Sequence, residues 1–166
     1  MYEAIVRAAL KGDILKFESL LQGVDPAAVT ADDHWNLLHR LLVSLTQEPP
    51  PEAVQKLIDI GVDVNAADRY GNTPLHYAAR RNAVGLMGML LDAGAAIDPV
   101  NEKGATPLRM MLAKKPHDAA AIELLLSRGA DIDQSAPGGD STKEYARKIL
   151  QKQEPQLFAL FEKYGH

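Results

Sequence analysis

A short phrase occurs twice in the chain, 33 residues apart, and constrains the fold more than any other feature. The sequence reads Gly-Asn-Thr-Pro-Leu-His-Tyr-Ala-Ala from Gly71 and Gly-Ala-Thr-Pro-Leu-Arg-Met-Met-Leu from Gly104. Self-similarity at a fixed period of this length indicates stacked units, each of which buries its apolar face against its neighbours. The repeat therefore predicts an elongated stack with an extended surface, rather than one compact fold around a catalytic pocket.

A second phrase recurs in step with the first. Gly61, Gly94 and Gly129 each follow a leucine-rich stretch and precede a polar turn, at intervals of 33 and 35 residues. Glycine suits the left-handed position that closes a helix. Thr73 and Thr106 suit the cap before a helix, and the proline that follows each suits the first helical position. Each unit is therefore predicted to be two helices and a connecting turn.

These phrases resemble the two signatures of the ankyrin repeat family. The resemblance rests on two segments, Thr-Pro-Leu-His-Tyr-Ala-Ala at 73–79 and Gly-Val-Asp-Val-Asn at 61–65. The resemblance implies an all-α, ankyrin-repeat solenoid of about five helix-turn-helix units, with degenerate repeats capping both ends. It also implies a structural role for a histidine in the signature, which ties one turn to the next by hydrogen bonds. The units of this single domain are predicted at residues 1–31, 32–66, 67–99, 100–133 and 134–166.

The third unit is the regular one; the first lacks the Thr-Pro-Leu signature, and the other three depart from it in different ways. In the second, Asn36-Leu37-Leu38-His39 replaces the signature, and His39 precedes its closing glycine by 22 residues, against 18 for His76. We assign the extra residues to a stiff, exposed loop at 46–51, which holds three prolines. In the fourth unit Arg109 replaces the histidine. In the last, Ser141-Thr142-Lys143-Glu144 predicts a capping box at a helix start.

Composition narrows the function classes. The chain has no cysteine, which excludes disulfides and thiolate metal sites. With a net charge of −4 and no long basic stripe, nucleic acid is not an expected partner. No apolar run reaches the roughly 18 residues of a membrane helix, and no signal peptide is evident. We expect a cytoplasmic protein that is complete and monomeric when free, and that needs no cofactor or metal.

Charge is unevenly distributed along the chain. Residues 1–67 carry five Lys and Arg against ten Asp and Glu, whereas residues 68–166 carry 13 against 12. The acidic half, which includes Asp32, Asp33, Glu48 and Glu52, predicts a surface that speeds association with a basic partner. The alternative is that the acidic excess serves only to keep the protein soluble, and the two interpretations stay open.

No catalytic constellation is evident. The five histidines lie in no His-Glu-x-x-His or His-x-His pattern, and neither a phosphate loop nor a Gly-x-Ser-x-Gly nucleophile motif is present. An enzyme that uses His76 with nearby carboxylates is a remote alternative. The favoured role of His39 and His76, which occupy equivalent repeat positions, is the structural one that the resemblance implies.

The leading hypothesis is a non-enzymatic module that binds a partner protein through its hairpin tips and the concave face of its inner helices. One version resembles small bacterial ankyrin proteins that act as immunity proteins, in which case the partner is a basic toxin or effector; the alternative is a scaffold or adaptor. Trp35 is either a contact or a packing residue of the second unit, and the proline insert competes with the concave face as the main contact. The candidate partner-binding residues are Asp33, His34, Trp35, Arg69, Tyr70, Asn72, Glu102, Lys103, Tyr77, Arg80, Arg81 and Lys114, with Arg40, Val43, Ser44, Ala105, Met110 and Ala113 as further positions.

Overall fold

The computed structural model describes residues 2–44, 47–135 and 138–165. Ten helices lie in these ranges, and no strand does; one isolated bridge pairs Ser135 with Ser141. The all-α prediction is therefore confirmed. In chain order the helices are α1 (Tyr2–Leu10), α2 (Ile14–Leu21), α3 (Leu37–Leu42), α4 (Pro51–Asp59), α5 (Pro74–Arg80), α6 (Val84–Asp92), α7 (Pro107–Leu112), α8 (Ala119–Ser127), α9 (Thr142–Leu150) and α10 (Pro155–Tyr164).

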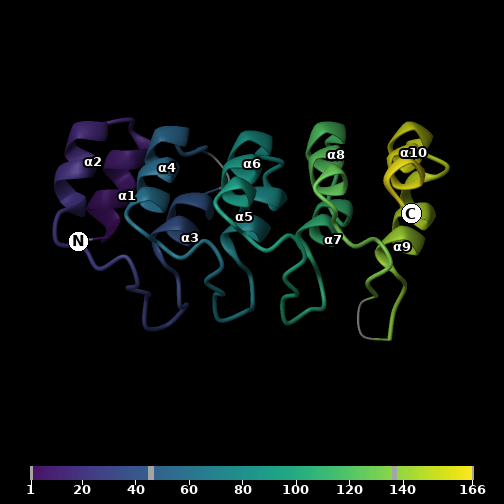
Figure 1. Ribbon diagram of the computed structural model, residues 1–166, viewed down its shortest axis with the longest axis horizontal. Coiled ribbons are helices and arrows are strands. Elements are labelled where there is room, and N and C mark those ends of the chain that lie inside the picture. Colours follow the sequence, from purple (N-terminus) through teal and green to yellow (C-terminus); the bar gives the residue numbers. More distant parts are fainter. Residues whose placement is uncertain (1, 45–46, 136–137, 166) are drawn as a thin grey trace.

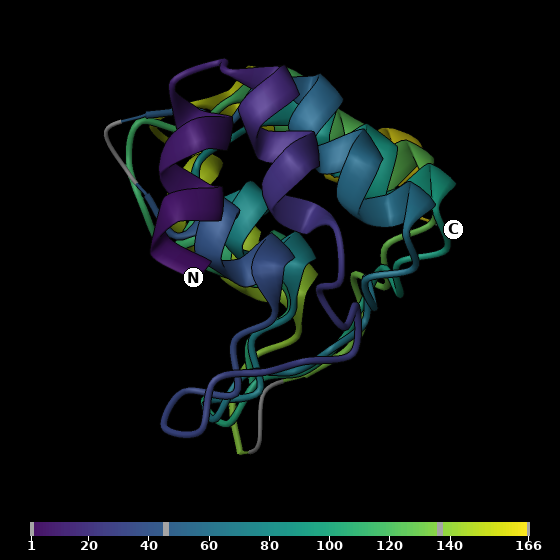
Figure 2. The same cartoon turned by 90° about the vertical axis from the view of Figure 1, so that its left-hand side faces the viewer.

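The helices form two rows. The inner row holds α1, α3, α5, α7 and α9, and the outer row holds the five even-numbered helices, so that successive pairs stack along one axis (Figure 1). Seen along that axis, the long turns between pairs project together to one side of the helices (Figure 2). Helix α5 packs on α3, α6 and α7, as each inner helix of a stack must. This arrangement confirms the predicted solenoid.

Local signals in the sequence produce the helix starts. The Thr106 hydroxyl accepts a hydrogen bond from the Arg109 amide at 3.2 Å, and Pro107 occupies the first helical position of α7. At α9 the predicted capping box forms: Ser141 and Glu144 bond each other's backbone amides at 3.2 and 3.1 Å. These bonds satisfy amide groups that would otherwise lack a partner at a helix start.

The second, third and fourth units are each tied to the next unit through one repeat position. The side chain of the third residue after an inner-helix cap donates to a backbone carbonyl of the next unit. That carbonyl belongs to the residue just before the cap of the next inner helix, and the N···O distances are 2.9–3.0 Å. In the third unit the Thr73 amide donates to His76 Nδ1, so the proton of the ring lies on Nε2 and donates to the carbonyl. Arginine makes the same tie where it replaces histidine. The three ties join His39 to Asn72, His76 to Ala105 and Arg109 to Asp140.

The predicted proline loop needs correction. Pro51 is the first residue of α4, where a missing amide hydrogen costs nothing, and so it belongs to the helix. Pro49 is buried, which contradicts the expectation of a fully exposed loop. Thr46, at the start of the proposed insert, lies outside the described residues. Part of the turn predicted at 136–138 also lies outside them.

Gly71 is required at its turn for two reasons. Its φ is +76°, and a β-carbon there would lie 3.0 Å from Asn101 Cα and 3.2 Å from the Glu102 amide nitrogen. Gly94, in the same unit, has a φ of +89° but no atom within 4 Å of the equivalent position. The left-handed backbone penalises alanine at both sites, whereas the contact with the next turn penalises it only at Gly71.

We therefore expect Gly71→Ala to lower the free energy of unfolding by about 2 kcal/mol and Gly94→Ala by about 1 kcal/mol. Urea unfolding followed by circular dichroism measures both. Equal costs for the two variants would show that the approach of the next turn is not a constraint.

Candidate functional site

The larger of two hollows on the concave side lies over α5, α7 and α9 and has a volume of about 800 Å³. Its walls come from these inner helices and from the turns at 68–72 and 101–105. We call this hollow the Tyr–Arg groove, after the side chains that give it its chemistry. They are Tyr70, Tyr77, Arg80, Lys103, Arg109 and Tyr145.

Two guanidinium groups in the Tyr–Arg groove are held over aromatic rings. Arg80 lies 5.0 Å from the centre of the Tyr77 ring, and Arg109 lies 4.7 Å from that of Tyr145. Arg109 also donates to the Asp140 carbonyl at 2.9 Å. Because these contacts restrict the rotamers of both arginines, less side-chain entropy is lost when a ligand binds.

A second hollow, of about 550 Å³, lies over α1 and α3, and we call it the N-terminal hollow. Arg7, Lys11 and Arg40 supply its basic side chains, and Asp33 is one of its two acidic ones. The two hollows are neighbours, because Arg80 of the Tyr–Arg groove donates to the carbonyl of Val43, which lines the N-terminal hollow, at 3.4 Å. The concave side therefore offers two adjacent recesses along the stack.

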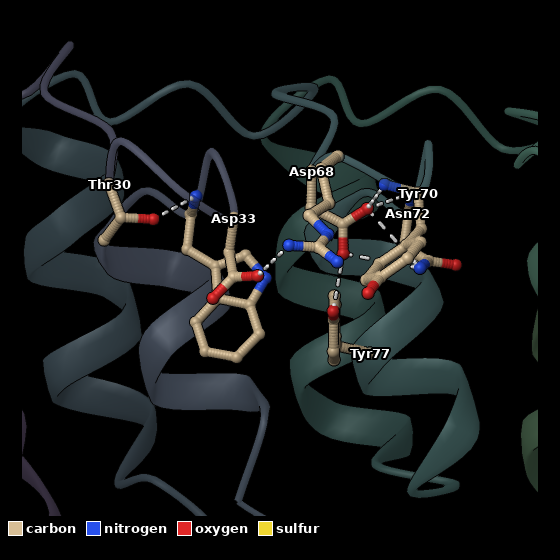
Figure 3. A network of polar contacts seen from close by, with 8 residues as sticks. Thr30, Asp33, Asp68, Tyr70, Asn72 and Tyr77 are labelled. Atoms are coloured by element: carbon tan, nitrogen blue, oxygen red, sulfur yellow. Dashed lines mark hydrogen bonds and ion pairs between the residues drawn. The ribbon is translucent and has the colours of Figure 1, made fainter.

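A buried carboxylate organises the turn between them (Figure 3). Asp68 is 4% exposed and accepts hydrogen bonds from the Tyr77 hydroxyl at 2.6 Å and from the amides of Tyr70 and Asn72 at 2.8 Å. Burial alone would raise the pKa of Asp68, but the bonds from Tyr77, Asn72 and Tyr70 outweigh it and hold the pKa below its ordinary value. Burial, and next the bond to Asp68, raise the pKa of Tyr77. One carboxylate thus fixes two of the groove's tyrosines.

Neighbouring turns are also joined to one another. The Arg69 amide donates to the Asp33 carbonyl at 3.0 Å, and their side chains form an ion pair at 3.5 Å. In the next turn the Glu102 amide donates to the Tyr70 carbonyl, again at 3.0 Å. Figure 3 shows Asp33 and Asp68 on adjacent turns. The tips therefore form a connected edge to the concave side.

Trp35 and Tyr77 are more deeply placed than the other candidates. Trp35 is half-buried and packs edge-on against Tyr77, with ring centres 6.4 Å apart. Tyr77 is only 7% exposed. Trp35 therefore packs between the second and third units and also lines the N-terminal hollow, so the two interpretations of this residue are compatible.

The arginine pair at the end of α5, Arg80 and Arg81, is partly buried. Arg80 is half-buried. Two nitrogens of Arg81 are buried and have no hydrogen-bond partner among the described residues. Burial lowers the pKa of Arg81, although Glu48 opposes the change.

The structure divides the twelve candidates into three groups. Half of them line the Tyr–Arg groove, two line the N-terminal hollow, and four line neither. The first group is Tyr70, Asn72, Tyr77, Arg80, Glu102 and Lys103; the second is Asp33 and Trp35; the third is His34, Arg69, Arg81 and Lys114.

Sequence reasoning did not select some residues that line the hollows. Tyr145 follows its cap, Ser141, by four residues, as Tyr77 follows Thr73, so alignment of the last unit on the repeat would have found it. Arg109 stood out only as a replacement for histidine, although it lies in the Tyr–Arg groove. Arg7 and Lys11 had no signal, because the first unit lacks the signature.

The acidic excess of residues 1–67 does not lie on the inner helices. Charge separates by face as well as by half of the chain, since the outer helices carry an excess of acidic side chains. The outer helices carry six acidic side chains against three basic ones. They are Glu18, Glu52, Asp59, Asp92, Glu123 and Glu162 against Lys16, Lys56 and Lys163. The inner helices carry Arg7, Arg40, Arg80, Arg109, Lys143, Arg147 and Lys148 against Glu3 and Glu144.

The environment of His76 does not support the remote catalytic alternative. The side chain is 0% exposed, and its two ring nitrogens are engaged with Thr73 and Ala105. Burial lowers the pKa of His76, although its bond to the Ala105 carbonyl opposes this.

Residues 2–44, 47–135 and 138–165 bring no three His, Asp or Glu side chains together as a metal site. Over the same ranges no helix has the length and apolar character to cross a bilayer.

Comparison with known proteins identifies repeats of one kind. A family model described as ankyrin repeats in three copies matches residues 5–99 and 42–136. The ankyrin repeat protein FPV219 of fowlpox virus is 38% identical over 93 residues, which cover 56% of this chain and 20% of that protein. Protein fem-1 homolog A of Bos taurus is 34% identical over 90 residues (50% and 14%), and the E3 ubiquitin-protein ligase KEG of Arabidopsis thaliana is 37% identical over 91 residues (54% and 6%). The chain thus spans a fifth or less of these relatives.

Proposed function

Since this chain belongs to the ankyrin repeat family, we propose that it binds a partner protein through its concave side and the adjoining turn tips. The observation that carries the proposal is the pair of adjacent hollows, of about 800 and 550 Å³, on one face of the stack. Both are lined by arginine and aromatic side chains, the residue types that dominate contact energies at protein interfaces. The main contact is then the concave side, with the loop before α4 in a secondary role.

Tyr70 is the most direct test residue. The residue is 47% exposed at the rim of the Tyr–Arg groove, and among the described residues only its backbone forms hydrogen bonds. Arg69 lies 4.7 Å from the ring centre, so the ring is held in place. Removal of the side chain should leave the fold intact and remove contact area from the rim.

We expect Tyr70→Ala to weaken capture of the partner by about tenfold, equivalent to about 1.4 kcal/mol. The measurement is quantitative mass spectrometry of proteins recovered on the immobilised chain from cells that naturally express it. Leu15→Ala is the matched control, because Leu15 is an 83% exposed apolar residue on the outer helix α2. If no recovered protein distinguishes Tyr70→Ala from the wild type and from Leu15→Ala, the concave side is not the binding surface.

Scaffolding and inhibition differ in what binding does to the partner. Addition of the pure chain to the captured partner leaves the partner's activity unchanged in the first case and abolishes it in the second. None of the three relatives named above has a name that describes an immunity protein. The basic inner helices also weaken the charge argument for a basic toxin. A scaffold or adaptor is therefore the version that we propose.

A further inference from the structure

The cations of the Tyr–Arg groove lack the ion pairs that most cations on or beside the outer helices form. Lys56, Arg128 and Lys163, on or beside outer helices, each form an ion pair at 2.8–2.9 Å. Lys16 of α2 is the exception among the outer-helix cations that the structure describes. Among the described residues, Arg80 and Arg109 have no carboxylate partner within 4.0 Å, and neither does Lys103 of the turn at 101–105. The groove therefore holds positive charge that the chain itself does not neutralise.

The groove also holds this charge in a fixed geometry. The guanidinium groups of Arg80 and Arg109 lie over tyrosine rings, and the buried Nε of Arg80 has no hydrogen-bond partner in the described parts of the chain. Glu102 is the one acidic side chain in the lining. Fixed donors next to tyrosine rings suit a carboxylate flanked by apolar groups, because the anion meets the arginines while apolar atoms cover the rings.

From this charge complementarity we infer that the Tyr–Arg groove binds an acidic, extended segment of the partner protein. An Asp or Glu side chain meets Arg80, Lys103 and Arg109, and neighbouring apolar side chains lie on Tyr70 and Tyr145. This inference rests on the proposed protein-binding function and specifies the chemistry of its ligand. A volume of about 800 Å³ accommodates several side chains, which favours a short segment over a folded surface.

Nucleic acid fits the groove less well. Three cations in one recess are fewer than an extended phosphate backbone requires, and Glu102 lies among them. The outer helices carry an acidic excess and the whole chain has a net charge of −4, which repels a long polyanion.

The test uses the full chain and three libraries of fluorescent twelve-residue peptides. Four fixed positions hold Asp or Glu in the first library, phosphoserine in the second and Lys in the third, and the other positions are varied. Fluorescence anisotropy then gives the dissociation constant of the best peptide from each library. We expect the carboxylate library to supply the tightest ligand, with an affinity that falls as salt rises.

Two substitutions assign that ligand to the groove. Arg80→Glu should weaken binding at least tenfold, and Lys103→Glu, in an exposed turn, about threefold. Lys16→Glu is the control, because it makes the same charge change on outer helix α2, and it should change binding less than twofold. Lys103→Glu keeps the test valid if Arg80→Glu perturbs folding. The inference is overturned by equal effects at Lys16 and in the groove, by selection of the lysine or phosphoserine peptides, or by tighter binding of a labelled single-stranded oligonucleotide.

The two proposals fail in different ways. Capture that depends on Tyr70 but is unchanged by Arg80→Glu and Lys103→Glu would retain the binding function and reject an acidic ligand. Capture that depends on none of these residues would reject the concave side itself.

Discussion

Replacement of His76 by alanine is expected to lower the free energy of unfolding by about 3 kcal/mol, because it leaves buried polar groups unpaired and opens a cavity. The imidazole is completely buried, accepts from the Thr73 amide at 3.1 Å and donates to the Ala105 carbonyl at 3.0 Å. Its loss removes one of the hydrogen bonds between the third and fourth units, the one buried among the helices. Since each unit is stable only against its neighbours, the urea transition should also broaden as the two sides of the stack unfold less cooperatively.

Arg109→Ala is the matched comparison, because Arg109 makes the corresponding tie to the Asp140 carbonyl but is half-exposed. Water can replace a half-exposed partner, so this variant should cost only about 1 kcal/mol. Urea unfolding monitored by circular dichroism measures both changes. Equal costs would mean that burial of the histidine does not contribute to the strength of the tie.

The pH profile provides a second readout of the same variant. Burial lowers the pKa of His76 below its ordinary value of 6.5, so the unfolded chain binds the proton more readily than the folded one. The stabilisation by His76 is therefore full above pH 6.5 and is lost as the pH falls through the lower folded pKa. His76→Ala should flatten this acid limb. A profile that matches the wild type would exclude a buried neutral imidazole.

The repeat and its caps were readable from the sequence, whereas the distribution of charge was not. Thr106 and Ser141 act through residues three positions away, so a local pattern suffices to identify them. Charge depends on which helix of a pair carries each residue. Counting along residues 1–67 adds the turns and loops to the helices, and so it hid the basic inner face behind an acidic total. Six of the ten acidic residues in this range lie outside the helices, at Asp13, Asp25, Asp32, Asp33, Glu48 and Asp63.

Contacts between units were predictable only where the repeat preserved them. His39 and His76 were correctly aligned as equivalent residues that bond to the next unit. The role of Arg109 became clear only from the structure, in which its side chain donates to the Asp140 carbonyl. Burial of Tyr77 was likewise hidden, because its hydroxyl is satisfied by Asp68, nine residues earlier and on a different element. A sequence pattern specifies residue type and period, while such pairs depend on the packed geometry.

The last prediction concerns that pair. Asn101, the repeat equivalent of Asp68, accepts from the amides of Lys103 and Ala105 at 3.0 Å, so asparagine can close this turn. The carboxylate is needed at Asp68 because it also accepts from the Tyr77 hydroxyl, whereas an amide group there would present a second donor. We therefore expect Asp68→Asn to lower the free energy of unfolding by about 2 kcal/mol.

A double-mutant cycle isolates the cause. In a Tyr77→Phe background the hydroxyl is absent, and Asp68→Asn should then cost only about 0.5 kcal/mol, which gives a coupling energy of about 1.5 kcal/mol.

The pH dependence is a second test. The pKa of Asp68 is held below its ordinary value of 3.8, so the contribution of Asp68 to stability is full above that pH and is lost as the pH falls through the lower folded pKa. The stability difference between wild type and Asp68→Asn should therefore shrink below about pH 4. A difference that persists unchanged in acid, or a cycle without coupling, would show that the turn needs the shape of this side chain and not its charge.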